Sequence, residues 1–302
     1  MHTLSVSLLG SVRISHTAHT QEMKTTRTIQ VLLAYIMLQR HRLHPREVLL
    51  DLFWSDRPID SARSCLNTAI WRLRAVLEPE GIQRGTYLIS NNSGEIGFNQ
   101  DSEYWLDVAE FEAEAMLVLT KPEQLLDASD VQRLEQVLAL YVGDLLDNFY
   151  DDWALSERAR LHRIYMDSLV CLMLYHAQDD NCNRSLEYGR QILHHDPLRE
   201  DIYREIMRLH MMNGQRALAI QTYHECAEML QRQLGIQPMS ETQAMYEWVA
   251  NAQHNQASIS TDVVIPVNIT DYLTSAKASI ELAQQQLAMV MQFIEETSNH
   301  NS

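Results

Sequence analysis

The stretch DSARSCLNTAIWRLRAVLE, residues 60–78, decides how the first part of this chain folds. Four aliphatic side chains recur in it at steps of four, three and four residues, so they form one face of a helix. These side chains are Leu66, Ile70, Leu73 and Leu77. Asp60 or Ser61 can cap the first turn, because a short polar side chain there accepts a backbone N–H. Pro79 ends the helix, because proline lacks the amide hydrogen that another turn would need.

The opposite face of this helix carries short hydrogen-bonding side chains, with arginines at its margins. At 100° per residue the outward row is Ser64, Thr68, Trp71 and Ala75, flanked by Ser61, Asn67 and Arg72, with Arg63 and Arg74 nearer the core edge. Such a row suits a DNA major groove, where Asn bonds adenine, Arg bonds guanine, and Ser or Thr bonds bases or phosphates. An ordinary solvated helix has the same pattern, so the neighbouring elements must decide.

Length and composition set the broad class. The 302 residues allow about two domains with an ample core. No apolar run reaches the roughly 18 residues that a membrane span needs, and the start MHTLSVSLLGSVRIS has no basic region before its apolar segment, so it predicts a strand instead of a signal peptide. The four cysteines have neither paired nor zinc-binding spacing. We therefore expect reduced thiols, a cytoplasmic location and no membrane partner.

Charge is distributed unevenly along the chain. The net charge is −16, but residues 1–100 hold 11 Lys and Arg against 8 Asp and Glu, whereas the remainder holds 13 against 32. A mildly basic first third on a strongly acidic remainder fits a DNA-contacting module joined to a protein-contacting one. Acidic surfaces also keep ordinary proteins soluble, so this distribution alone does not fix the function.

The first hundred residues predict a winged helix-turn-helix. Alternating side chains predict two short strands around a turn at Gly10, and apolar periodicity predicts helices over 25–40 and 46–54 ahead of the helix at 60–78. Residues 87–98 predict a hairpin, with Asn91 and Asn92 at its tip. In this architecture the third helix enters the major groove and the hairpin reaches the adjoining backbone or minor groove. Phosphate contacts are expected from Lys24, Arg27 and Arg46, for which plain surface charge is the alternative.

Three motifs in this part resemble the DNA-binding half of the SARP family, which are bacterial antibiotic-pathway activators with a response-regulator-type winged helix. They are SLLG at 7–10, REVLLDLFWSD at 46–56 and SARSCLNTAIWRLRAVLEP at 61–79. Trp54 and the triplet Arg72-Leu73-Arg74 carry much of the match. The resemblance implies binding to direct repeats near promoters and contact with RNA polymerase holoenzyme. Head-to-tail sites need more than one protomer, so a homo-oligomer is expected at least on DNA.

Residues 101–252 predict a helical repeat domain. Apolar periodicity runs through 108–119, 131–140, 153–175, 185–193, 202–212, 217–234 and 239–252. Ser185 lies 34 residues before Ala219, each follows a polar loop, and Pro197 stands where the tetratricopeptide pattern ends its second helix. Small side chains that permit close helix crossings are Ala177, Ser185, Gly189, Ala217 and Ala219.

The same region closely resembles the bacterial transcriptional activator domain that follows the winged helix in SARP proteins. The matching segments are 141–161, 194–238 and 240–248, and their sharpest motifs are DPLRE at 196–200 and LGIQP at 234–238. We expect structural roles in these motifs. Asp196 can cap a helix, Gly235 can take a positive φ, and Arg199 and Glu200 can tie helices together.

The last fifty residues predict a linker at 253–267 and an amphipathic helix at 268–297. Apolar residues from Ile269 to Ile294 follow steps of four and three over roughly four heptads. Two alanines interrupt the seam and few charges flank it. The helix could pair with a second copy or dock on a repeat domain, and the family resemblance does not cover it.

The chain lacks the usual catalytic patterns. With nine glycines it has no G-x-x-x-x-G-K-[ST] loop, and HExxH and G-x-S-x-G are also absent. We predict no catalytic residues, no cofactor, no metal and no enzymatic activity. The fold class predicted is mainly α, with a winged helix-turn-helix over 1–100 and an all-α tetratricopeptide-like repeat domain over 101–252. The function predicted is a sequence-specific DNA-binding transcriptional activator. The alternative is a protein-interaction adaptor with little or no DNA binding.

Overall fold

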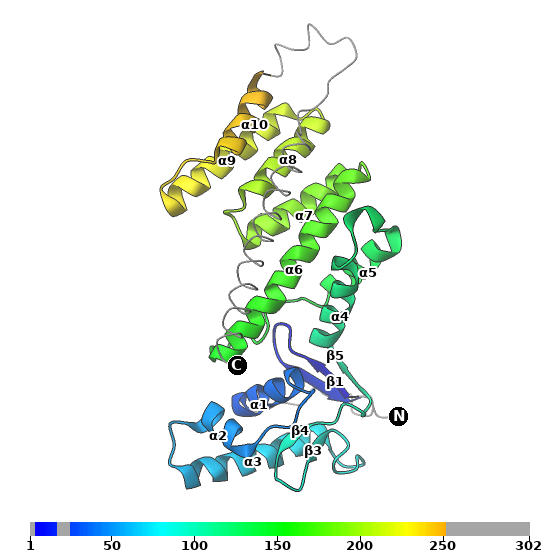
Figure 1. Cartoon of the computed structure of the whole chain (residues 1–302), viewed down its shortest axis with the longest axis vertical. Helices are drawn as coiled ribbons and strands as arrows, with labels where there is room; N and C mark the ends of the chain where they lie inside the picture. Colours follow the sequence, from blue (N-terminus) through cyan, green and yellow to red (C-terminus); the bar gives the residue numbers. More distant parts are fainter. Residues whose placement is uncertain (1–3, 17–24, 252–302) are drawn as a thin grey trace, which may run out of the picture. The chain divides into compact units, whose positions relative to one another are not determined.

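The computed structural model describes residues 4–16 and 25–251, and Figure 1 shows the course of the chain. Met1–Val249 form one compact unit, and a second unit begins at Ala250. The predicted linker at 253–267 and the predicted helix at 268–297 lie outside the described residues. The predicted class is confirmed, because the described chain is mainly helical and its strands all precede residue 107.

A small sheet begins the chain. Strands β1 (Leu4–Ser7) and β2 (Arg13–His16) pair antiparallel, and Gly10 takes a positive φ of 82° in the turn between them. This hairpin was expected from the alternating side chains. A third strand, β5 (Tyr104–Leu106), pairs parallel with β1. The sequence did not predict β5, because three residues carry no usable period and only the pairing with β1 makes them a strand.

Three helices follow the first hairpin. They are α1 (Arg27–Leu38), α2 (Arg46–Trp54) and α3 (Ile59–Leu77), close to the predicted spans 25–40, 46–54 and 60–78. Their apolar faces meet in one core, whose fully buried leucines include Leu32, Leu33, Leu49, Leu66 and Leu73. Burying one such side chain stabilises the fold by about 1.5–3 kcal/mol. Packing, more than the helix propensity of these segments, therefore holds the three helices together.

The start of α3 differs from the expectation. Pro58 is the N-cap, with φ −54°, and no side chain caps the helix, so the cap predicted at Asp60 or Ser61 is wrong. Proline is already close to helical φ and donates no N–H, so the helix can begin at Ile59, two residues before the start that a cap at Asp60 would give. Asp60 lies instead in the first turn, where its charge faces the positive end of the helix dipole.

The predicted hairpin at 87–98 is present as the wing. Strands β3 (Leu88–Ser90) and β4 (Ile96–Phe98) pair antiparallel. The backbone of Ile96 exchanges two hydrogen bonds with that of His44, at 2.8 and 2.9 Å, which joins the wing to the loop before α2. A Cβ on Gly97 would lie 2.7 Å from Leu43 Cδ2 and 3.1 Å from the carbonyl oxygen of Arg42, so the absence of a side chain lets the wing approach the backbone of this loop closely.

The rest of the described chain is helical. Besides a 3₁₀ turn, η1 (Glu123–Leu125), its helices are α4 (Asp107–Leu119), α5 (Ala128–Leu138), α6 (Asp152–Gln178), α7 (Cys182–His195), α8 (Glu200–Met212), α9 (Arg216–Leu234) and α10 (Ser240–Asn251). Each one coincides with a segment whose periodicity predicted a helix. The tightest packing joins α6 to α7 and α8 to α9, which form the two helix pairs visible in Figure 1.

The backbone repeats with the predicted 34-residue period. Ser185 in α7 and Ala219 in α9 are both completely buried at equivalent places. The turns that precede these helices also match, because Asp180 and Gly214, 34 residues apart, both adopt left-handed φ angles, 54° and 69°. Two successive helix pairs therefore share one geometry, as in tetratricopeptide-like repeats.

Close crossings in the repeats use some of the predicted small residues. A Cβ on Gly189 would lie 3.0 Å from Ile206 Cγ1, so α7 and α8 approach closely at this glycine. Ser185 donates its hydroxyl to Met173 O at 2.8 Å, which ties α7 to α6. Ala217 is exposed, and the crossing role predicted for it is wrong.

The predicted structural roles of Gly235, Glu200 and Asp196 have different outcomes. Gly235 ends α9 with φ 71°, as expected. Glu200 ties α8 to α10, because its carboxylate accepts the Met239 N–H at 2.8 Å and the Thr242 hydroxyl at 2.7 Å. Asp196 does not cap α8. It accepts the N–H of Leu198 and holds the turn between α7 and α8.

One buried carboxylate joins the first sheet to the helical part. Asp107, at the start of α4, is 3% exposed and accepts the N–H groups of Leu8 and Leu9 at 2.8–2.9 Å and that of Val108 at 2.7 Å. Burial raises the pKa of this carboxyl, and the three N–H groups offset only part of the rise. No local pattern in the sequence indicates this role, because the partners lie about a hundred residues earlier.

Candidate nucleic-acid interface

The outward face of α3 is open to solvent. Its exposed side chains include six predicted there: Arg63, Ser64, Asn67, Thr68, Trp71 and Arg72. Trp71 is 70% exposed, whereas Leu66 and Leu73, on another face of the same helix, are fully buried. The buried leucines fix the rotation of α3 about its axis. The polar row and the indole therefore point away from the core.

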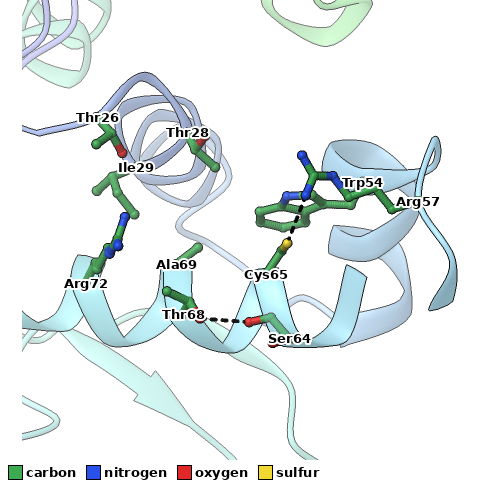
Figure 2. A pocket seen from close by; sticks show the side chains of 10 residues that line it. All are labelled: Thr26, Thr28, Ile29, Trp54, Arg57, Ser64, Cys65, Thr68, Ala69 and Arg72. Carbon is green, nitrogen blue, oxygen red and sulfur yellow. Dashed lines mark hydrogen bonds between the residues drawn. The ribbon is translucent and has the colours of Figure 1, made fainter. Parts of the chain in front are cut away.

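A groove between α3 and the beginning of α1 borders this face on one side. It has a volume of about 260 Å³, and Figure 2 shows its lining side chains. Thr26 and Thr28 come from the start of α1, Arg57 from the loop between α2 and α3, and Thr68 and Arg72 from α3. No side chain caps α1 at Thr26. The first N–H groups of α1 are thus left for an anion, such as a phosphate, at the positive end of the helix.

Sequence reasoning missed Thr26, Thr28 and Arg57 as members of this site. Arg57 extends across the groove edge and donates to Cys65 Sγ at 3.3 Å. It lies in the loop between α2 and α3, where no periodic pattern marks it. Only its position just before Pro58, at the start of the helix predicted to enter the major groove, could have suggested a contact with the backbone of a duplex.

A second groove, of about 460 Å³, separates α3 from the wing. Asn67 and Trp71 line it from α3, and Arg84 lines it from the loop before the wing. Arg46, predicted as a phosphate contact, also lines this groove and donates to Asn67 Oδ1. Its aliphatic stem lies beside Gly94 at the wing. Arg46 therefore bridges α2, α3 and the wing, with other N–H groups left for a ligand.

A hydroxyl group on the outward face of α3 forms a hydrogen bond within the helix itself. Thr68 donates its hydroxyl to Ser64 O, one turn earlier, at 2.9 Å, as Figure 2 shows. Its oxygen can still accept a hydrogen bond, so Thr68 offers an acceptor to a partner. Arg63 lies 3.8 Å from Asp60, and both side chains are more than half exposed. Such a pair contributes little to stability and leaves Arg63 available.

Two of the predicted contact residues also make contacts within the chain. Arg74 is 14% exposed and pairs with Glu78 at 2.8 Å, and it lines the groove between α3 and the wing. Arg27 donates to Asn148 O at 2.9 Å and its guanidinium carbon lies 4.9 Å from the Phe149 ring centroid. It thus joins α1 to the helical part, and its side chain is exposed. The DNA contacts of both arginines stay predictions. Lys24 lies outside the described residues.

The wing tip carries the two predicted asparagines. Asn91 and Asn92 are both exposed. Asn91 accepts the backbone N–H of Glu95 at 3.0 Å and donates to the Glu95 carboxylate at 2.5 Å, so it closes the turn. Asn92 stands at the tip itself. Asn92 is therefore the better placed of the two for a contact with a duplex, because the polar atoms of Asn91 are engaged.

The wing is fastened to the end of α3 by one carboxylate. Glu78 Oε1 accepts the N–H groups of Gly85, Tyr87 and Leu88, each at 3.0 Å, while Oε2 accepts from Arg74. Burial acts to raise the pKa of Glu78, but the three N–H groups and Arg74 outweigh it and the net pKa is lowered. Glu78 thereby fixes the wing relative to the helix that it flanks.

The described residues offer little for other chemistry. Within 4–16 and 25–251, no three His, Cys, Asp or Glu side chains are grouped so that they could hold a metal ion. A search of the same residues for a helix with the length and apolarity of a membrane span finds none.

Known proteins resemble this chain over most of its length. Residues 106–249 match the bacterial transcriptional activator domain. The regulatory protein AfsR of Streptomyces coelicolor is 25% identical over 234 residues, which are 76% of this chain and 23% of AfsR. The transcriptional regulatory protein MoaR1 of Mycobacterium tuberculosis is 22% identical over 223 residues, 72% of this chain and 70% of MoaR1. This chain thus spans about a quarter of AfsR and more than two thirds of MoaR1.

Among solved structures, that of Mycobacterium tuberculosis EmbR in complex with a low-affinity phosphopeptide has the same fold. The TM-score is 0.67 at 17% identity, and the superposition covers 94% of this chain and 72% of EmbR. At this identity the likeness establishes the arrangement of the elements only.

Proposed function

We propose that this chain, which is similar to SARP-type transcriptional regulators, is a sequence-specific DNA-binding activator of transcription. In this proposal residues 1–100 bind the duplex and α3 lies in the major groove. The helical repeats of residues 101–252 contact other proteins. A protein with this role works where the chromosome is, which in a bacterium is the cytoplasm.

The observation that carries the proposal is the composition of the exposed face of α3. A donor amide, an indole and a guanidinium, from Asn67, Trp71 and Arg72, stand on one side of a helix whose other side is buried. These groups match what base edges and phosphates offer in a major groove. The grooves on both flanks contain further arginines, Arg57 and Arg46, which can hold phosphates beside the groove.

The acidic helical part suits protein contacts better than DNA contacts. It carries most of the negative charge of the chain, which would repel a duplex. By family resemblance its partner is RNA polymerase holoenzyme. Binding to direct repeats would place two protomers head to tail, so we expect a homo-oligomer on DNA.

A gel shift with native promoter fragments tests the proposal. Exchanging Asn67 and Arg72 together for alanine should abolish the specific shift while circular dichroism remains unchanged, because both side chains are exposed. The matched control is the exchange of Arg232 and Gln233 for alanine, which removes the same charge from an exposed part of α9. If the Asn67/Arg72 variant shifts the fragment as well as the control does, α3 is not the reading helix.

A second function is favoured by the weak charge of the first hundred residues, which is only +3 from their Lys, Arg, Asp and Glu counts. In it the acidic repeats make the chain a protein-interaction adaptor with little DNA binding. Salt distinguishes the two, because neutralised phosphates make DNA binding fall steeply as salt rises. A pull-down that recovers protein partners, with no genomic fragment retained at low salt, would support the adaptor.

A further inference from the structure

A groove in the helical repeats lies among α7, α8 and α9 and has a volume of about 240 Å³. The side chains on which its chemistry depends are Arg190 of α7, Tyr203 and Ile206 of α8, and Leu218 and Glu225 of α9. An enclosed cavity of about 150 Å³ holds a benzene molecule. This groove therefore has room for a molecule the size of a free amino acid.

One buried side chain of this groove has an unused polar atom. Tyr203 is 6% exposed and lines the groove. Its hydroxyl has no hydrogen-bond partner among residues 4–16 and 25–251, and it is not a fully enclosed atom. Buried polar groups in proteins are almost always hydrogen-bonded. The hydroxyl therefore opens on the groove and is available to a ligand there.

Opposite charges stand on the two helices beside α8. Arg190 of α7 and Glu225 of α9 are both exposed. Within the described residues Arg190 has neither a hydrogen bond nor an ion pair, so it does not pair with Glu225. Glu225 accepts from Gln221 Nε2 at 2.8 Å through one oxygen and keeps the other open. The groove thus presents a cation and an anion to whatever enters it.

The two charges begin close to one another along the groove. Arg190 directly follows the glycine at which an added Cβ would lie 3.0 Å from Ile206 Cγ1. Glu225 directly precedes the buried cysteine that packs against Tyr203. Ile206 and Tyr203 are three residues apart on one face of α8. Arg190 and Glu225 therefore start within about one helical turn of each other along the groove.

A free α-amino acid with an apolar side chain matches all of these groups. At neutral pH it carries a carboxylate, which suits a guanidinium, and an ammonium group, which suits a carboxylate and a hydroxyl oxygen. Its side chain can pack on Ile206, 5% exposed, and on Leu218, 41% exposed. An internal peptide segment carries neither charge on its backbone, and a simple carboxylic acid carries only one. Each of these would leave a charged side chain of the groove unmatched.

We propose that the groove among α7, α8 and α9 binds a free apolar α-amino acid. Arg190 donates to its carboxylate, and Glu225 accepts from its ammonium group. The Tyr203 hydroxyl also accepts from the ammonium group, because it lies on the Glu225 side of the groove. Burial raises the pKa of Tyr203, with smaller contributions from Cys226 and Glu225, so the hydroxyl is neutral. The aliphatic part of the ligand covers the apolar side chains of the groove.

Calorimetric titration of leucine into the full chain, without DNA, tests the site. We expect saturable binding of about one leucine per chain. Isocaproic acid is leucine without its amino group, isoamylamine is leucine without its carboxylate, and glycine lacks the apolar side chain. The first two should bind about three- to tenfold more weakly than leucine, because the charges of the groove are exposed. Glycine should bind at least about tenfold more weakly, because it leaves the apolar side chains uncovered.

Variants of the groove assign each polar group. Arg190→Met should bind leucine and isoamylamine equally, because the carboxylate has lost its partner. Glu225→Gln should lose most of the difference between leucine and isocaproic acid. Tyr203→Phe removes only the hydroxyl and should weaken the binding of leucine about two- to tenfold. The controls Arg232→Met and Glu228→Gln change an exposed ion pair of α9 outside the groove and should leave leucine binding unchanged.

The outcomes also separate this inference from the proposed function. If leucine does not bind at millimolar concentrations, or if the Arg190 and Glu225 variants bind it as tightly as the wild type does, the groove is not an amino-acid site. If isocaproic acid binds as tightly as leucine, the ligand is a carboxylic acid and the role of Glu225 is refuted. The titration contains no DNA, so a failure here leaves the proposed activator function to be decided by the gel shift.

Discussion

Replacing Glu78 by glutamine should loosen the wing. Its carboxylate is 1% exposed and accepts three backbone N–H groups at 3.0 Å and the Arg74 guanidinium at 2.8 Å. Glutamine keeps one oxygen for the N–H groups, but these bonds lose their charge, and Arg74 loses its acceptor. Breaking a buried ion pair costs about 3–5 kcal/mol, and we expect a loss of that size in the free energy of unfolding at pH 7.

The pH dependence gives this prediction a second part. The pKa of Glu78 is lowered in the folded chain from its ordinary value of 4.5. Its stabilising contribution is therefore complete above the pKa of the unfolded chain and is lost as the pH falls through the folded pKa. The stability difference between wild type and Glu78→Gln should stay constant from about pH 8 to 5.5 and shrink below about pH 4.5.

Amide hydrogen exchange measures the local effect. The amides of Gly85, Tyr87 and Leu88 should exchange faster in Glu78→Gln, while those of α1 change much less, and urea unfolding gives the overall loss. Glu80→Gln is the control, because Glu80 is exposed two residues away. The reasoning is refuted if Glu80→Gln loses as much stability, or if the loss in Glu78→Gln is the same at pH 3.5 as at pH 7.

Two other exchanges test contacts between distant segments. Gly97→Ala should lower the melting temperature and cost about 1–3 kcal/mol, because the added Cβ would lie 2.7 Å from Leu43 Cδ2 and 3.1 Å from the backbone oxygen of Arg42, so that both the leucine and the loop must give way. Asp107→Asn should cost about 1.5–3 kcal/mol in chemical unfolding, because one of the N–H groups of Leu8 and Leu9 meets an NH₂ group in place of an oxygen.

The controls for these exchanges are Ser93→Ala at the exposed wing tip and Asp101→Asn in the exposed loop before β5. Both should change stability by less than about 0.5 kcal/mol. A Gly97→Ala protein as stable as Ser93→Ala would mean that the wing does not press on the loop before α2. An Asp107→Asn protein as stable as Asp101→Asn would contradict the joining role of Asp107.

Periodicity was enough to locate the helices. The four-three-four spacing from Leu66 to Leu77 fixed the span of α3, and the same rule located every helix from α4 to α10. The spacing locates these helices because one side of each helix is buried, and the residues of a buried side are apolar and recur every three or four positions. The strand β5 was missed because three residues are too few to show a period.

The candidate site was predictable in part. The side chains of α3 that face outward followed from the position of its leucines, and Asn67, Trp71 and Arg72 are exposed as the spacing implied. The sequence could not show that Arg74 turns to Glu78, or that Arg27 reaches Asn148. An arginine side chain is long enough to choose among several partners, and only the neighbours that folding supplies decide which one it meets.

The sequence by itself thus determined which segments are helices and which side of each is buried, because these properties depend on residues within a few positions of one another. It also showed that a 34-residue unit repeats, because small residues after polar loops recur at that spacing. The tertiary structure alone decided the contacts that join the segments. Asp107 accepts a hydrogen bond from Leu9, about a hundred residues earlier in the chain. Glu78 accepts one from Tyr87 at the base of the wing, and Arg46 donates one to Asn67 Oδ1. These contacts give hydrogen-bond partners to polar groups that folding removes from water or brings close together. The packing of the core determines which partner each group meets, and no local sequence pattern shows that packing.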